Sequence, residues 1–174
     1  MKPFLFLIPD KCGNEELIKA SYSGVPGASS EWRSDHNAAL AFKPQTTEWA
    51  WAPKDNSLPA IIWYHFDYTF TLAKISFTSR NGDAWDQTPK TFDIVGSNDC
   101  SNWNILKSVT NAEFTSGGQT KLWNIPCKSQ KPYECFGIDA LEPKNGGSNM
   151  VSLTNIQMSG FVPGKTNALG FKFR

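Results

Sequence analysis

Residues 89–103 read PKTFDIVGSNDCSNW, and this stretch decides the fold class. From Phe92 to Ser97 the side chains alternate between two sets, which is the period-two pattern of a β-strand. The polar run SNDCS follows at once and is rich in residues that favour tight turns. Trp103 then begins the next segment with a large aromatic side chain. The stretch therefore predicts a strand that turns sharply back into an antiparallel neighbour.

The same pattern recurs on both sides of this stretch. Residues 61–68 are β-branched and aromatic, while residues 73–78 and 136–140 alternate between apolar and polar. Short turn signals separate these runs, namely Val25-Pro26-Gly27, Asn81-Gly82-Asp83, Ser116-Gly117-Gly118 and Asn145-Gly146-Gly147. Only residues 14–20 have a composition that allows a helix. Many short strands with regular turns indicate an all-β sandwich or barrel.

One strand near the C-terminus changes its alternation. Val151 and Leu153 share one parity, whereas Ile156 and Met158 share the other. A one-residue bulge near residues 154–155 would return both pairs to the core face.

Composition limits the classes of partner. The chain has 174 residues, enough for one domain with a sizeable core, and its net charge is +1. No run of Lys or Arg forms a basic groove, so we expect no nucleic-acid partner. The motifs of serine hydrolases, zinc proteases and nucleotide-binding loops are missing, so we expect no catalytic activity. Seven Trp residues instead favour a packed core or a binding surface.

Four cysteines, an even number, permit two disulfides and an oxidising compartment. Four free thiols in a cytosolic protein remain the alternative. The apolar run at residues 4–8 is too short for a signal peptide and no cleavage site follows it. Extracellular localisation therefore depends on the cysteines and on the family resemblance described next.

Three segments carry that resemblance: PAIIWYHFD at 59–67, FTLAKISFTSR at 70–80 and the opening stretch at 89–103. Together they resemble the discoidin-like family, also called coagulation factor 5/8 type C domains. The likeness covers about residues 15–161 of a single domain spanning 1–174, with an extension at each end. It implies a jelly-roll β-sandwich of two antiparallel sheets, with ligand recognition by loops at one end.

The chain departs from the family pattern at two places. Residues 39–43 stand where many members carry an acidic calcium ligand, and this chain has none there, although backbone carbonyls could still coordinate Ca²⁺. The metal ligands thus remain unknown. The family's terminal disulfide also lacks its second cysteine, since Ser159 stands near the expected place. The resemblance then suggests pairing Cys100 with Cys135 and Cys12 with Cys127.

Three loops at residues 26–37, 44–59 and 79–89 would form the ligand end. An indole in such a loop stacks on a sugar or enters a membrane interface, and an Arg beside it adds planar hydrogen-bond donors. Packing under its own loop is the structural alternative for each such Trp, and ion pairing is the alternative for an Arg. The ligand-binding residues that we expect are Trp32, Arg33, His36, Trp51, Arg80, Asp83 and Trp85.

The function that this pattern favours is a non-catalytic, extracellular carbohydrate-binding module for adhesion or recognition, with a glycan or glycoprotein as partner. Two alternatives stay open. The same loops could dock a protein as part of a structural matrix, or their tryptophans could insert into a lipid membrane. The sequence does not distinguish them, because it does not tell which tryptophans are exposed.

Overall fold

The computed structural model describes residues 17–43, 50–54, 57–144 and 150–162. Its strands are β1 (Ile18–Lys19), β2 (Gly24–Ala28), β3 (Ala60–Thr78), β4 (Pro89–Ser97), β5 (Asn104–Val109), β6 (Thr120–Asn124), β7 (Pro132–Pro143) and β8 (Thr154–Phe161). Its helices are short, namely α1 (Ala38–Phe42) and the 3₁₀ turns η1 (Ser34–His36), η3 (Gly82–Gln87) and η4 (Cys127–Ser129). None of the helices in the described ranges has the length and apolarity needed to cross a bilayer.

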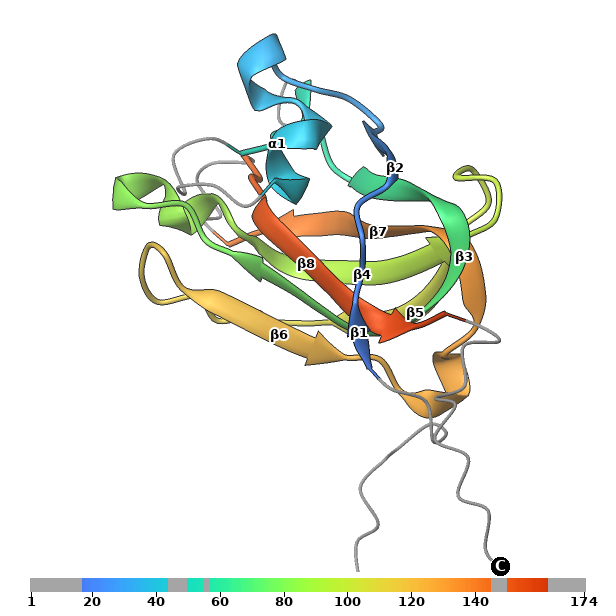
Figure 1. Cartoon of the computed structure of the whole chain (residues 1–174). Coiled ribbons are helices and arrows are strands. Elements are labelled where there is room, and N and C mark those ends of the chain that lie inside the picture. The colour runs from blue at the N-terminus through green and yellow to red at the C-terminus, as the bar shows by residue number, and fades with distance from the viewer. Residues whose placement is uncertain (1–16, 44–49, 55–56, 145–149, 163–174) are drawn as a thin grey trace, which may run out of the picture.

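Strand β3 joins the two layers of the sandwich. Its first residues pair antiparallel with β2 and β7, and β7 continues to β4 and β5. Residues 71–78 of β3 pair instead with β8, and residues 74–78 pair with β6. Figure 1 shows β3 curving between these two groups of strands. All these pairings are antiparallel, which confirms the predicted all-β jelly-roll sandwich of two antiparallel sheets.

The core fills the space between the layers and is rich in phenylalanine. The ring of Phe77 stacks on Trp123 with a centroid distance of 4.7 Å and on Phe114 at 5.3 Å. At the other end, Phe70 and Phe136 meet edge to face at 5.9 Å. Strand β3 supplies Phe70 and Phe77, β6 supplies Trp123, and β7 supplies Phe136.

The predicted bulge near residues 154–155 is present. Val151, Leu153, Ile156 and Met158 are all buried although they belong to two parities. Asn155 has a φ of 50°, and the register between β3 and β8 shifts between Ser76 and Thr78. Asn155 thus marks a bulge that adds one residue to β8 relative to β3, and both apolar pairs stay buried in the core.

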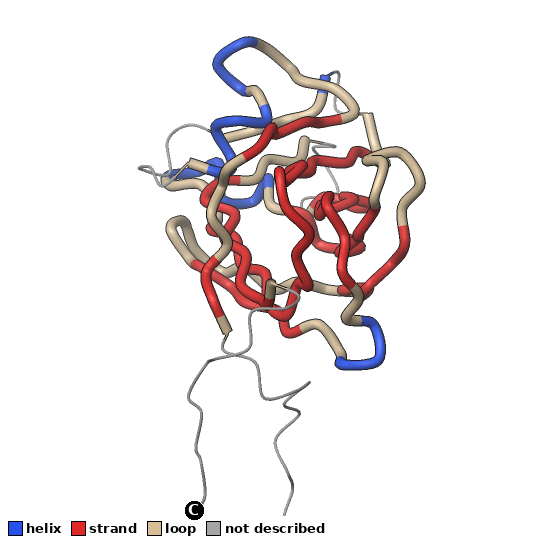
Figure 2. Tube along the Cα trace, turned by 45° about the vertical axis from the view of Figure 1, so that its right-hand side comes forward, coloured by secondary structure: helices blue, strands red, loops and turns tan. Residues whose placement is uncertain are grey.

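The helix prediction for residues 14–20 was wrong where the structure describes it, because Ile18 and Lys19 form a strand with β8. Pairing with a strand edge outweighs a weak local preference in so short a segment. A helix forms instead at Ala38–Phe42, where Ala38, Ala41 and Phe42 are buried. Figure 2 shows η1 and α1 at one end of the strand array and η4 at the other.

The predicted Cys100–Cys135 disulfide is present, with the two Cα atoms 5.6 Å apart. It ties the loop after β4 to strand β7. Cys127 is also disulfide-bonded. Its predicted partner, Cys12, lies outside the described residues, so that pairing stays a prediction.

Candidate functional site

The loop between β2 and β3 holds most of the predicted ligand residues in a defined shape. The backbone N–H of Trp32 donates to the Ala52 carbonyl at 2.9 Å, and the Ala52 N–H donates to the His36 carbonyl at 3.3 Å. The Glu31 carboxylate accepts a hydrogen bond of 2.8 Å from the Ala38 N–H at the start of α1. These bonds position η1 and its side chains at one end of the sandwich.

Among the described residues of this loop, Trp32 is the exposed aromatic side chain, with 40% of its surface accessible. The guanidinium carbon of Arg33 lies 4.1 Å from the centre of the indole. The imidazole of His36 meets the same ring edge to face at 4.8 Å. The indole is therefore held between two neighbours while a large part of it still faces solvent.

Asp35 organises the polar part of the same turn. Its Oδ1 accepts a hydrogen bond from His36 Nδ1 at 3.0 Å and forms an ion pair with Arg33 Nε at 3.1 Å. The hydrogen bond from His36, followed by the charge of Arg33, lowers the pKa of the Asp35 carboxyl. An ionised carboxylate only accepts, so Nδ1 of His36 is the donor in this hydrogen bond, and in the tautomer that carries its single proton on Nδ1 the other nitrogen, Nε2, is an acceptor.

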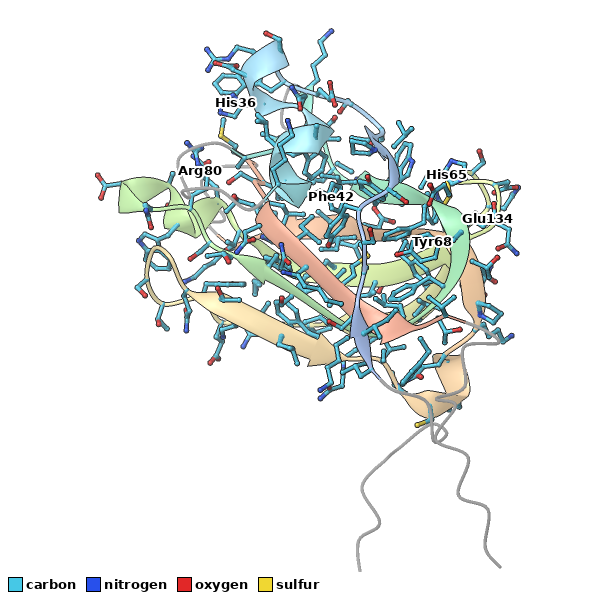
Figure 3. The ribbon with its side chains drawn as sticks, viewed as in Figure 1. His36, Phe42, His65, Tyr68, Arg80 and Glu134 are labelled. Carbon is cyan, nitrogen blue, oxygen red and sulfur yellow. A yellow bond between two sulfur atoms is a disulfide. The ribbon has the colours of Figure 1, made fainter. Side chains whose placement is uncertain are left out.

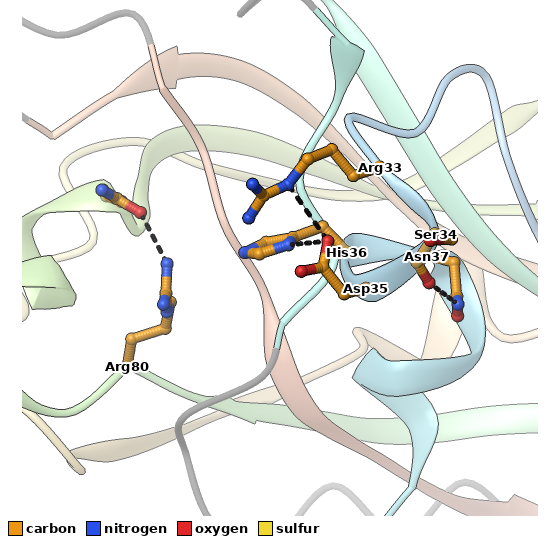
Figure 4. A network of polar contacts seen from close by, with 7 residues as sticks. Arg33, Ser34, Asp35, His36, Asn37 and Arg80 are labelled. Carbon is orange, nitrogen blue, oxygen red and sulfur yellow. Dashed lines mark hydrogen bonds and ion pairs between the residues drawn. The ribbon is translucent and has the colours of Figure 1, made fainter.

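Arg80 reaches the same corner from a different part of the chain. It follows the end of β3, and its Nη1 donates to Gln87 Oε1 at 3.2 Å. Ser152 also donates to this oxygen, at 3.3 Å, which links Arg80 to the segment before β8. Burial lowers the pKa of the guanidinium. In Figure 4 the His36 imidazole extends toward the side on which Arg80 lies, and the Arg80 guanidinium is directed along its hydrogen bond to Gln87.

Two of the predicted ligand residues, Arg33 and His36, are thus in contact with Trp32. His36 is almost buried, with 6% of its side chain exposed. Arg33 lies on the indole and on Asp35 and acts by holding both in place.

The prediction that Trp51 is a ligand-binding residue was wrong. It is fully buried, and its Nε1–H donates to the Ser30 carbonyl at 2.9 Å. Its backbone also pairs with Leu153 in an isolated antiparallel bridge. Pairing with the other layer turns the indole inward, where its single polar group finds a partner.

The remaining two predicted residues lie on η3. Asp83 is exposed at the start of this turn. Trp85 packs partly against the core, and Lys144 Nζ lies 3.8 Å from the centre of its ring. Because a protein ammonium group already covers part of the ring, Trp85 is a weaker stacking platform than Trp32.

Two residues that contribute to this site were not predicted from the sequence. Gln87 anchors Arg80, and nothing in the local sequence distinguishes it from any other loop glutamine. Asp35 was noticed as a loop residue but given no role, and its position next to His36 was the available signal.

Calcium coordination through backbone carbonyls stays a prediction for the described part of the chain. There, one group of His, Cys, Asp or Glu side chains is close enough to share a metal ion. It consists of His65, Cys100 and Cys135. These are nitrogen and sulfur atoms, whereas Ca²⁺ requires several oxygen ligands. Residues 39–42 form α1 and its buried face.

A family model for the F5/8 type C domain matches residues 18–156. The chain belongs to the F5/8 type C domain family. The match spans most of the chain and agrees with the resemblance of its three diagnostic segments. No curated protein matches the sequence.

Solved structures of F5/8 type C domains and related modules share the fold. A module from Clostridium perfringens in complex with GalNAc-β-1,3-galactose superposes with a TM-score of 0.64 at 17% identity, covering 77% of this chain and 93% of its own. The family 32 carbohydrate-binding module of Clostridium perfringens NanJ, in complex with galactose, gives 0.61 at 17% identity, covering 78% and 92%. The F5/8 type C domain of a Bacteroides fragilis protein gives 0.67 at 15%, covering 84% and 97%.

Proposed function

We propose that this F5/8 type C domain is a non-catalytic carbohydrate-binding module that holds a galactose-type sugar at the corner formed by Trp32, His36 and Arg80. The observation that carries the proposal is the exposed indole of Trp32 with His36 against its edge, and with Arg80 on the same side of the molecule (Figures 3 and 4).

The three side chains offer complementary contacts to a sugar. Nε2 of His36 accepts a hydrogen bond from a hydroxyl group, since Asp35 holds the proton on Nδ1. The planar guanidinium of Arg80 donates to neighbouring hydroxyl or ring oxygens. The indole of Trp32 covers the patch of C–H groups that galactose presents on one face. A sugar bound in this way is oriented by its polar face and held by its apolar face.

The ligands of similar modules support this choice of sugar. The two Clostridium perfringens modules were solved with galactose and with a disaccharide of GalNAc and galactose. Some other similar structures are enzymes that contain this fold as one part. The match covers 34% of the chain of an alginate lyase and 15% of the chain of a family 89 glycoside hydrolase. This agrees with a binding role in which the fold supplies recognition and carries no reaction of its own.

We place the domain in an extracellular role of recognition or adhesion. The Cys100–Cys135 disulfide and the oxidised Cys127 fit an oxidising compartment. A single corner site of this size binds weakly, so several copies on one scaffold or surface would raise the avidity.

Calorimetry with galactose, GalNAc and glucose tests the proposal. We expect the wild-type domain to bind galactose and GalNAc, and we expect His36→Ala and Arg80→Ala to lose this binding while keeping their circular dichroism spectra. Lys128→Ala is the matched control, because Lys128 is an exposed cation on η4 at the other end of the sandwich.

Two results would overturn the proposal. Unchanged affinity in both site variants would move the sugar elsewhere on the domain. No binding of any sugar in calorimetry and on a glycan array would reject carbohydrate recognition. Sedimentation with anionic liposomes and capture of a protein partner then separate the membrane and protein-docking alternatives.

A further inference from the structure

A second cluster of ligating side chains lies on the outer face of the sheet, away from the sugar corner. Strand β3 places His65 directly opposite Cys135 of β7, and β4 places Ser97 on the other side of Cys135. Cys100 reaches Cys135 from the loop after β4. In Figure 3, His65 and Glu134 lie on the opposite side of the molecule from His36 and Arg80.

The donor atoms of this cluster are close together. One nitrogen of His65 and the sulfurs of Cys100 and Cys135 all lie within 4.8 Å of one another. Glu134 brings a carboxylate to the same imidazole, with its Oε2 3.7 Å from His65 Nε2. Cys135 is buried, whereas His65 is exposed and Cys100 is partly accessible, so the cluster is open to solvent on one side.

We propose that reduction of the Cys100–Cys135 disulfide converts His65, Cys100 and Cys135 into a zinc site, with Glu134 supporting His65. The reductant is a thiol. Two thiol molecules reduce the disulfide to two cysteine thiols and become one external disulfide. Zn²⁺ then binds the two thiolates and the neutral imidazole, and the two thiol protons pass to solvent.

The present spacing requires only small movements to hold the ion. Zn–S bonds of about 2.3 Å in a tetrahedral site place the two sulfurs roughly 3.8 Å apart. The Cα atoms of Cys100 and Cys135 are 5.6 Å apart, and the antiparallel pairing of β3 with β7 already fixes His65 beside Cys135. Two thiolates with an imidazole form a soft donor set that prefers zinc to calcium or magnesium.

Glu134 gives the site the outer support that metal-bound histidines usually have. A carboxylate that accepts a hydrogen bond from one imidazole nitrogen orients the other nitrogen toward the metal and makes it a better donor. Glu134 Oε2 lies 3.7 Å from His65 Nε2, so a small movement of either side chain would form this hydrogen bond. Cys100 and Cys135 thus form a covalent link under oxidising conditions, and together with His65 they form a metal site under reducing ones.

Cobalt titration of the full chain tests this inference. The Cys12→Ser/Cys127→Ser variant leaves Cys100 and Cys135 as its only cysteines. After reduction with a phosphine, we expect one Co²⁺ per chain, with the intense visible bands of a tetrahedral site and a thiolate-to-cobalt charge-transfer band. Zn²⁺ should displace the cobalt and remove these bands. Without reduction, neither the visible bands nor the charge-transfer band should form.

Substitutions of the two histidines separate this site from the sugar site. We expect His65→Ala to lose the tetrahedral cobalt spectrum, and Glu134→Gln to weaken zinc binding about 10- to 100-fold. His36→Ala is the matched control and should keep the full cobalt spectrum. The oxidised His65→Ala protein should in turn keep any galactose affinity. The experiments can therefore reject the zinc site without rejecting the sugar site, and they can reject the sugar site without rejecting the zinc site.

Two results would overturn the zinc inference. The first is a cobalt spectrum that is the same with and without His65, since the thiolates alone would then explain it. The second concerns folding. If the reduced variant loses its near-ultraviolet circular dichroism, Zn²⁺ must restore it, because metal binding to a native site stabilises the fold. A reduced chain that zinc does not refold contradicts the proposal.

Discussion

Replacing Trp32 by alanine tests the sugar corner most directly. A tryptophan side chain presents roughly 250 Å² when it is fully accessible. With 40% of its surface exposed, Trp32 has about 100 Å² left for a ligand. At about 25 cal/mol per Å², covering all of this area contributes about 2.5 kcal/mol, and covering half contributes about 1.2 kcal/mol. We therefore predict that Trp32→Ala weakens galactose binding by between about 8-fold and about 70-fold.

Calorimetry against galactose measures this loss, and near-ultraviolet circular dichroism checks that the fold is kept. Leu122→Ala is the matched control, because Leu122 is an exposed apolar residue on β6, 56% accessible, with no part in the corner. Trp32→Phe should recover part of the affinity, since a smaller ring still covers part of the sugar. An affinity of Trp32→Ala within twofold of the wild type, combined with loss of binding in His36→Ala, would refute stacking on this indole.

Three further predictions concern stability, each measured by urea unfolding. Cys100→Ala/Cys135→Ala should lose up to about 4 kcal/mol, from the loop entropy of a 35-residue separation; a loss below about 1 kcal/mol would contradict this. Phe77→Ala should cost about 3–5 kcal/mol, because Phe77 is fully buried. Burial, and then the charge of Asp93, raise the pKa of Asp139, so Asp139→Asn should stabilise by up to about 1 kcal/mol at neutral pH.

The sign of the Asp139 effect gives it a pH signature. A carboxyl whose pKa is raised by folding destabilises the native state when it is ionised, and this cost is complete above the raised pKa. As the pH falls through that pKa the cost is relieved, and it is gone below the pKa of the unfolded chain. The advantage of Asp139→Asn should therefore shrink toward acid pH. An advantage that is constant with pH would point to packing instead of charge.

Local sequence patterns determined the class of fold. Alternation over residues 73–78 and 92–97 predicted strands, and the change of parity between Leu153 and Ile156 predicted the bulge near residues 154–155, where Asn155 has a positive φ. These features are readable because side chains alternate along a strand with a fixed period, whatever the strand pairs with. The Cys100–Cys135 disulfide was also anticipated, but from the family resemblance and not from spacing.

Exposure of the tryptophans was decided only by tertiary structure. Trp32 and Trp51 both lie in loops of similar composition, yet Trp51 is fully buried and Trp32 is 40% exposed. The difference comes from partners distant in the sequence, since Leu153 pairs with the backbone of Trp51 and draws its indole into the core. Burial depends on which residues pack against a side chain, and the local sequence pattern does not specify those residues.

The sequence by itself thus determined an all-β sandwich, its strand positions and the loops that could hold a ligand. Only the tertiary structure placed Arg80 on the same side of the molecule as His36, through the turn at the end of β3 and its anchor on Gln87. It alone placed His65 beside the Cys100–Cys135 disulfide, through the register of β3 with β7. Such convergence depends on long-range strand pairing, which is set by the packing of the whole core and not by any single segment.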